Sequence, residues 1–84
     1  MIANAEIFRS ELTKIIMNAK EQKKEYVDVI SGDLHRQVGG YPSKNHSMPT
    51  CCDVMKSMMN PKDEILYQPP KGRGATLKIR YFIK

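Results

Sequence analysis

The chain of 84 residues is long enough for one small domain, which we place over residues 1–84, and it leaves little room for an enclosed active site. Its 40% hydrophobic and 27% charged residues exclude the fibrous and disordered classes, and no apolar run approaches the roughly 20 residues that cross a bilayer. The net charge of +5 makes nucleic acid a candidate partner, and Asn4, Glu6 and Arg9 exclude the apolar start of a signal peptide.

The first half of the chain predicts a helix, a strand and a second helix. The first helix runs from about residue 4 to residue 23 with Asn4 as its N-cap, because apolar side chains recur on one side of the helical wheel: Ala5, Phe8, Leu12, Ile15, Ile16 and Ala19. The short β-branched segment 26–30 predicts a strand. Ser31 is expected to cap a short second helix, which ends at Gly39-Gly40.

The second half predicts one helix and two strands. Proline suits the first position of a helix, so the third helix begins at Met48-Pro49, and Pro61 stops it. Its wheel places Cys51, Val54, Met55 and Met58 inward, Cys52 and Met59 at the margin, and Thr50, Asp53, Lys56, Ser57 and Asn60 outward. Residues 64–67 and 76–83 predict strands, joined by the Pro/Gly-rich loop 68–75.

This order of elements predicts an α+β fold, the winged helix-turn-helix, with three helices, a small antiparallel sheet and a basic wing. A small domain of another topology is the alternative. The expected core is Phe8, Leu12, Ile15, Leu34, Val54, Met55, Met58, Ile65, Leu77 and Ile79.

Positive charge is concentrated in one half of the chain. Residues 1–43 contain six basic and six acidic side chains, whereas residues 44–84 contain eight Lys and Arg and three acids. A one-sided basic field is expected of a nucleic-acid binder, although many small basic proteins have no such partner.

Several segments carry a resemblance to a known family. They are Ser31-Gly32-Asp33-Leu34-His35-Arg36, Gly39-Gly40-Tyr41-Pro42, Asn45-His46, Met48-Pro49-x-Cys51-Cys52-x-Val54-Met55 and Pro69-Pro70-Lys71-Gly72-x-Gly74-Ala75-Thr76-Leu77. Together they resemble a small bacterial domain found alone or beside HNH-type, restriction-like nuclease modules. The resemblance covers about residues 26–83 and implies a winged-helix, DNA-binding domain. The family often has arginine where Ser47 stands, and the HNH segment is absent from this sequence, so nuclease activity is not implied.

Two groups of residues are the candidate nucleic-acid contacts. In a helix-turn-helix, the start and outward side of the third helix would face the major groove, which selects Lys44, Asn45, His46, Ser47, Thr50, Lys56 and Ser57. Asp53 on that side would repel phosphate unless it accepts a hydrogen bond from cytosine or is paired, for example by Lys56 or Lys44. Alternatively, these residues form a turn and a helix face that contact only solvent.

The second group is the set of cations in and after the wing: Lys71, Arg73, Lys78 and Arg80. Wing cations touch the sugar-phosphate backbone and contribute affinity without sequence information. For Lys78 and Arg80, a charged strand edge that discourages aggregation is an equal alternative.

His35, His46, Cys51 and Cys52 raise the question of a metal or a thiol nucleophile. Their spacing does not suit a structural zinc site, and two adjacent helical cysteines point about 100° apart, so we predict no metal and a core role for Cys51. Adjacent cysteines also favour a reducing, cytoplasmic environment. With no phosphate cradle and no paired carboxylates over a cleft, we expect no catalytic residue and no cofactor.

The sequence therefore favours a non-catalytic module that binds double-stranded DNA. The alternative is a protein-interaction adaptor that recruits a nuclease or modification enzyme through residues 48–59, where methionines cluster. Binding of RNA rather than DNA stays open, because the sequence shows no recognisable stacking platform or 2′-OH reader.

Overall fold

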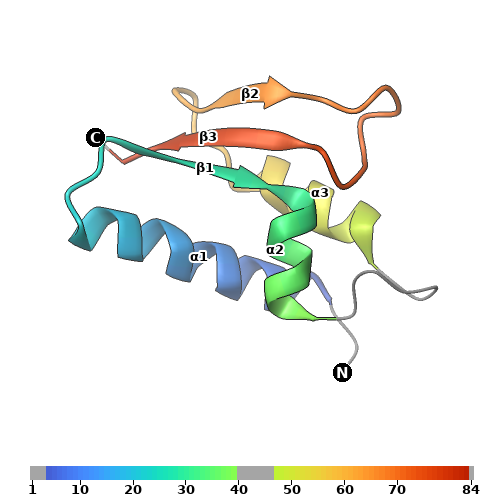
Figure 1. Ribbon diagram of the computed structural model, residues 1–84, viewed down its shortest axis with the longest axis horizontal. Helices are drawn as coiled ribbons and strands as arrows, with labels where there is room; N and C mark the ends of the chain where they lie inside the picture. Colours follow the sequence, from blue (N-terminus) through green and yellow to red (C-terminus); the bar gives the residue numbers. More distant parts are fainter. Residues whose placement is uncertain (1–3, 40–46, 84) are drawn as a thin grey trace.

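The computed structural model describes residues 4–39 and 47–83. Within them the elements follow the predicted order: α1 (Ala5–Glu21), β1 (Tyr26–Ile30), α2 (Ser31–Val38), α3 (Met48–Ser57), β2 (Glu64–Tyr67) and β3 (Lys78–Phe82). The fold is a small α+β arrangement in which three helices lie on one side of a three-stranded antiparallel sheet (Figure 1).

The last strand in the chain is the centre of the sheet. The spatial order is β1-β3-β2, so β3 pairs with both other strands. Between β1 and β3 the register is regular, from Tyr26 opposite Phe82 to Ile30 opposite Lys78. Strand β3 is shorter than the predicted 76–83, because the backbone of Leu77 and Ala75 turns to bond the start of α2.

The ends of the first two helices have identifiable local causes. Asn4 caps α1 as predicted, since its side-chain oxygen accepts from the Ile7 N–H at 3.0 Å. The helix ends at Glu21, two residues before the predicted end, and Lys23 takes the left-handed conformation with φ 59°. Gly39, with φ 107°, ends α2 as expected.

The prediction of Ser31 as an N-cap is wrong. Ile30 occupies the cap position of α2, and Ser31 is the first helical residue. The Ser31 hydroxyl is buried and donates to the Gly74 carbonyl instead of bonding the first turn of its own helix. Its bonding capacity therefore joins α2 to the loop between β2 and β3.

The core lies between the sheet and the helices. Burial alternates along the end of the chain, since Leu77, Ile79 and Tyr81 are buried and the Tyr81 hydroxyl donates to the Met55 carbonyl at 2.7 Å. Of the other expected core residues, the fully enclosed ones are Phe8, Leu12, Leu34, Val54 and Met55. Ile15 and Met58 are partly buried, and they pack against the core from its margin.

The prediction of Ile65 as a core residue is wrong, because its side chain is 40% exposed. It faces Ile79 across the sheet, but β2 is an edge strand and all four of its residues are exposed. Sequence reasoning also missed His35, which is enclosed and makes an edge contact with the Phe8 ring at 4.9 Å between centroids. Cys52, placed at the margin of its helix, is fully buried.

Candidate nucleic-acid interface

Helix α3 has a buried side and a polar side, as its wheel predicts. The helix begins at Met48 and carries Pro49 in its first turn, as expected. Cys51, Cys52, Val54 and Met55 are buried against the rest of the domain. Thr50, Asp53 and Ser57 lie on the accessible side, although the Ser57 hydroxyl already donates to the Val54 carbonyl at 2.8 Å.

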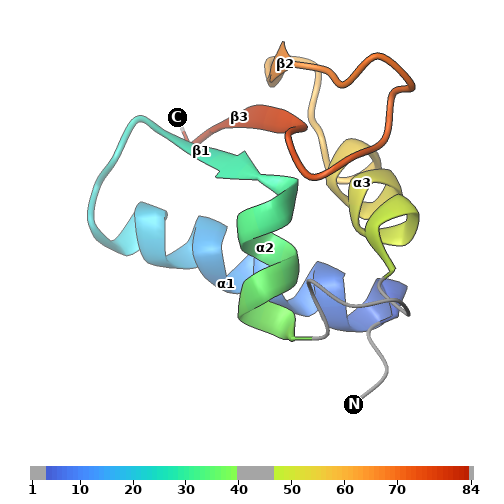
Figure 2. The same cartoon turned by 45° about the vertical axis from the view of Figure 1, so that its right-hand side comes forward.

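The β2–β3 loop, residues 68–77, lies against α3 and the start of α2 (Figure 2), held by backbone bonds to α2 and by side chains of α3. The Gly74 N–H donates to Cys52 Sγ at 3.3 Å, and the Cys52 thiol donates to the Gly74 carbonyl at 3.3 Å. Gly32 N–H donates to the Ala75 carbonyl at 2.9 Å, and Ser31 N–H donates to that of Leu77 at 2.9 Å. We call this set of contacting residues the junction: Ser31, Gly32, Cys52, Gly74, Ala75 and Leu77.

Glycine at position 32 is required by the closeness of the two backbones. A Cβ atom there would lie 2.8 Å from the Ala75 carbonyl oxygen, a separation shorter than Cβ atoms tolerate. The Ser-Gly and Cys-Cys segments that carried the family resemblance therefore meet the Gly-x-Gly-Ala segment at the junction. Their structural role is to fix the position of the loop relative to α3.

Above the junction, side chains join the loop to the polar side of α3. Arg73 binds Asp53 through two bonds, Nε to Oδ1 at 3.0 Å and Nη2 to Oδ2 at 3.2 Å. Lys56 Nζ donates to the Gly72 carbonyl at 2.7 Å. Asp53 is thus paired as its position required, but the partner is Arg73 and not the expected Lys56 or Lys44.

This ion pair gives Arg73 a partner within the chain. The sequence predicts Arg73 as a contact to the DNA backbone at the loop tip, and the structure shows two of its three guanidinium nitrogens, Nε and Nη2, bound to Asp53 of α3. Both side chains remain more than half exposed, so the pair is at the surface and contributes little to stability. Lys71 is exposed at the loop tip, as predicted.

A shallow groove lies beside the polar side of α3 and was missed in the sequence. Its volume is about 290 Å³, and its lining combines α1 and α3: Ala5, Arg9, Thr50, Asp53, Val54 and Ser57. Arg9 therefore flanks α3 on the side of α1, while Lys71 and Arg73 belong to the loop that packs against α3. The charge balance within the first half of the chain concealed Arg9, because its role depends on how α1 packs against α3.

Lys78 and Arg80 lie apart from this group. The strand alternates, so they occupy the sheet face opposite to buried Ile79 and Tyr81, away from the helices. Arg80 binds Asp28 through two bonds of 2.8 and 3.0 Å, and its guanidinium carbon lies 3.9 Å from the centroid of the Tyr26 ring. The hydrogen bonds from Arg80 lower the pKa of Asp28. Arg80 is therefore engaged within the sheet.

The remaining predicted contacts fall around the start of α3. Lys44, Asn45 and His46 lie outside the described residues. Ser47 is half-buried, and its N–H donates to Nε2 of buried His35 at 2.9 Å. This contact fixes the entry of α3 relative to α2.

The buried thiols have the properties of core side chains. Burial raises the pKa of Cys51 to about 12, which disfavours the reactive thiolate, and its Sγ lies 3.6 Å from the Ser31 carbonyl oxygen. Across residues 4–39 and 47–83, no three His, Cys, Asp or Glu side chains are grouped to hold a metal ion. Within the same ranges, no helix combines the length and the apolar composition needed to cross a membrane.

Comparison of the chain with protein-family models, with curated proteins and with solved structures finds no match.

Proposed function

We propose that this protein is a winged-helix module that binds duplex DNA, with α3 and the loop before it in the major groove and the β2–β3 loop as the wing. The layout of three helices and a sheet in the order β1-β3-β2 is compatible with this family of folds. Its function would be to occupy DNA or to deliver a partner to it, without catalysis.

The observation that carries the proposal is the distribution of cations around the polar side of α3. Arg9 lines the groove on one flank of that side, and Lys56 and Arg73 link it to the β2–β3 loop on another. Thr50 lies between these groups, with a hydroxyl that suits a base edge or a phosphate. A reading helix with cations on both flanks matches the geometry of a helix in a groove between two phosphate backbones.

The contact with Asp53 fits this arrangement. An unpaired carboxylate facing DNA would repel phosphate, but Asp53 is bound by both Nε and Nη2 of Arg73. The pair fixes the guanidinium beside α3, so that Nη1 is the part of Arg73 available to a phosphate. The wing and the helix would then approach DNA as one preformed surface.

The adaptor hypothesis drew on a methionine-rich surface, and that feature is largely enclosed. Met48 and Met55 are buried, and Met58 and Met59 pack partly against the core. We therefore retain DNA as the partner to test first.

The direct test is an amide-shift titration of the whole chain with a random duplex of about 16 base pairs at 50 mM salt. We expect the largest shifts at Thr50, Ser57, Arg9 and residues 71–73, and smaller ones on the outer sheet face at Lys78. Absence of binding at 50 mM salt would refute the proposal. Shifts restricted to the outer sheet face would refute the assignment of α3 as the reading element.

A pair of substitutions separates base reading from backbone contact. Changing Asn45 or Thr50 to alanine should weaken binding to a preferred site more than to random DNA, by about 1–3 kcal/mol for a good base contact. Changing Arg9 to alanine should weaken binding to the preferred site and to random DNA by a similar factor, because a phosphate contact carries no sequence information. Equal losses on both duplexes for every variant would mean that α3 reads no sequence.

A further inference from the structure

The two edges of the sheet are built differently. Strand β2 has four residues, and its pairing with β3 is interrupted by a register shift between Ile65 and Tyr67. Prolines also flank it, at positions 61, 69 and 70. Natural sheets use bulges and prolines of this kind to prevent pairing with other chains. Strand β1 has none of them, since all five of its residues pair with β3 in unbroken register.

The outer edge of β1 presents backbone N–H and C=O groups at the spacing that pairs with a second extended chain. Ile83 N–H donates to the Glu25 carbonyl and Ser31 N–H to that of Leu77, so the odd-numbered residues of this segment bond toward β3. The N–H and C=O groups of Tyr26 and Asp28 therefore point away from the sheet. Outside the ladder between β1 and β3, the described part of the chain offers these four groups no hydrogen-bond partner.

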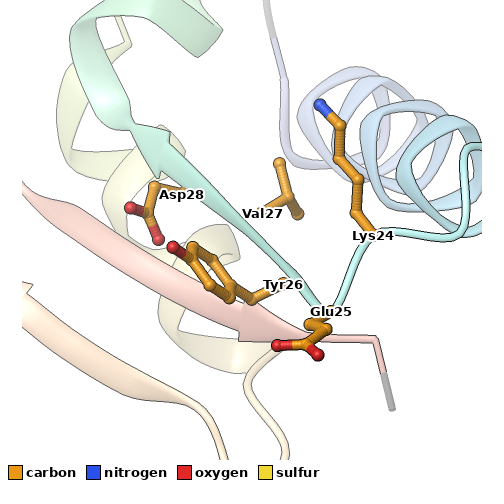
Figure 3. Close-up of a pocket in the computed structure, with 5 residues that line it drawn as sticks. All are labelled: Lys24, Glu25, Tyr26, Val27 and Asp28. Carbon is orange, nitrogen blue, oxygen red and sulfur yellow. The ribbon is translucent and has the colours of Figure 1, made fainter.

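An open groove follows this edge. Its volume is about 510 Å³, and five consecutive residues line it, from Lys24 to Asp28 (Figure 3). Figure 3 shows Val27 turned to the side of α1, with Tyr26 and Asp28 turned to the other face of the strand. A groove that runs along one strand, with alternating side chains, has the form of a site for an added strand.

We propose that a second copy of this chain occupies the groove, with the two β1 strands antiparallel about a two-fold axis between their Val27 residues. In this register Tyr26 lies opposite the partner's Asp28, and Asp28 lies opposite the partner's Tyr26. Each of these pairs exchanges two backbone hydrogen bonds, so all outward groups of Tyr26 and Asp28 in both copies are satisfied. The two half-buried Val27 side chains meet at the axis.

Charge disfavours one shifted register and favours a second copy as the occupant. Shifting the strands by two residues, so that the axis passes between the Asp28 residues, would oppose two carboxylates. In the proposed register the partner's Asp28 approaches Tyr26, the ring over which Arg80 lies at 3.9 Å. Asp28 is itself bound by Arg80 of its own chain through bonds of 2.8 and 3.0 Å, so across the axis the carboxylate of one Asp28–Arg80 pair lies toward the guanidinium of the other. The same complementarity recurs on the other side of the axis, as an isologous interface requires.

The test compares two substitutions at one position by sedimentation equilibrium of the whole chain, between about 5 and 500 µM. Tyr26→Ala removes the ring and keeps the N–H group, whereas Tyr26→Pro removes the ring and also the outward N–H. Neither change removes a bond between β1 and β3, because the Tyr26 N–H points outward, and an edge strand accepts proline. We expect the parent chain to form dimers as its concentration rises, and Tyr26→Pro to dimerise at least about tenfold more weakly than Tyr26→Ala.

Hydrogen exchange in the parent chain supplies a readout that does not depend on the variants folding. The amides of Tyr26 and Asp28 should exchange more slowly at 500 µM than at 5 µM, whereas the exposed amides of β2 should not change. A parent chain that stays monomeric at 500 µM would overturn the proposal. Dimers that form equally in both folded variants, or that leave the Tyr26 and Asp28 amides unprotected, would also overturn it. The outcome is independent of whether the protein binds DNA.

Discussion

The junction and the charged surface on the polar side of α3 both join the β2–β3 loop to the helices, but they differ in burial and in the kind of contact. At the junction, buried Ser31, Gly32 and Cys52 bond the backbone of residues 74–77. On the polar side of α3, exposed Asp53 is bound by exposed Arg73, and half-buried Lys56 donates to the Gly72 carbonyl. The distinctive sequence segments belong mainly to the junction. They specify where the loop lies, and ordinary charged residues supply the surface that we propose binds DNA.

The largest expected effect comes from the end of the core that adjoins the junction. Leu77→Ala removes a fully buried side chain and should lower the free energy of unfolding by about 2–5 kcal/mol. Ile65→Ala, at a residue that is 40% exposed, should lower it by less than about 1 kcal/mol. Urea unfolding of both variants measures the difference. Equal losses would contradict the placement of these two residues.

Gly32→Ala tests the junction itself, and here the sign is informative. Within an ordinary helix, changing Gly to Ala stabilises the protein by about 0.5–1 kcal/mol. Here the added Cβ would lie 2.8 Å from a backbone oxygen, so we expect a loss of about 1–3 kcal/mol. Gly74→Ala is the control, with its nearest contacts at 3.3 Å to the Pro69 side chain, and it should cost less. A stabilised Gly32→Ala variant would show that α2 and the loop are not in contact.

The buried thiol of Cys51 gives a smaller effect. Cys51→Ser should cost about 1–2 kcal/mol, because a hydroxyl replaces a thiol in an enclosed site, and a chelator should leave the melting temperature of the parent unchanged. The pKa of about 12 keeps the folded thiol protonated, so alkylation at pH 8.5 should be slow until the chain unfolds. Helical signal lost on adding a chelator would contradict the assignment of Cys51 as a core side chain and would indicate a bound metal ion.

Asp53→Asn sharpens the comparison on the charged surface, with the smallest expected effect. The carboxylate competes with phosphate for Arg73, so its removal should strengthen duplex binding by about two- to fivefold and change stability little, because the pair is exposed. Fluorescence anisotropy with a random duplex measures the change, and Asp33→Asn is the matched control, since Asp33 pairs with Arg36 within α2. Weaker binding by Asp53→Asn would show that the carboxylate has a positive role in recognition.

The sequence predicted the elements of this fold better than the contacts between them. Periodicity located α1, α3 and the strands within a few residues, because each has one buried face. Ser31 was misassigned because a serine before a helix suits an N-cap, whereas the acceptor it uses, Gly74, is 43 residues away. Ile65 fits a core pattern, but its exposure follows from the position of β2 at the edge of the sheet, and local sequence does not encode that position.

The candidate site shows the same limit. Thr50 and Asp53 lie on the accessible side of α3, as the helical wheel predicts, and Lys71 is exposed in the loop, as its Pro/Gly-rich setting predicts. The partner of Asp53, the flanking position of Arg9 and the engagement of Arg80 by Asp28 all depend on tertiary contacts between distant segments. Pairing of charges across elements is decided by packing, and the sequence supplies only the residues that take part.

The most direct test of the proposed DNA interface is the salt dependence of duplex binding in a pair of matched double variants. Lys71→Ala/Arg73→Ala removes two cations from the loop beside α3. Lys20→Ala/Lys23→Ala removes two exposed cations, one from the last turn of α1 and one from the turn that follows it. Each phosphate contact contributes a slope of about 0.9 in the logarithm of affinity against the logarithm of salt concentration. Because Arg73 shares its charge with Asp53, the loop variant should lower the slope by between about one and two. The α1 variant should leave it nearly unchanged. Equal slopes in both variants, or no measurable binding of the parent at 50 mM salt, would contradict the assignment of α3 and the loop as a DNA-binding surface.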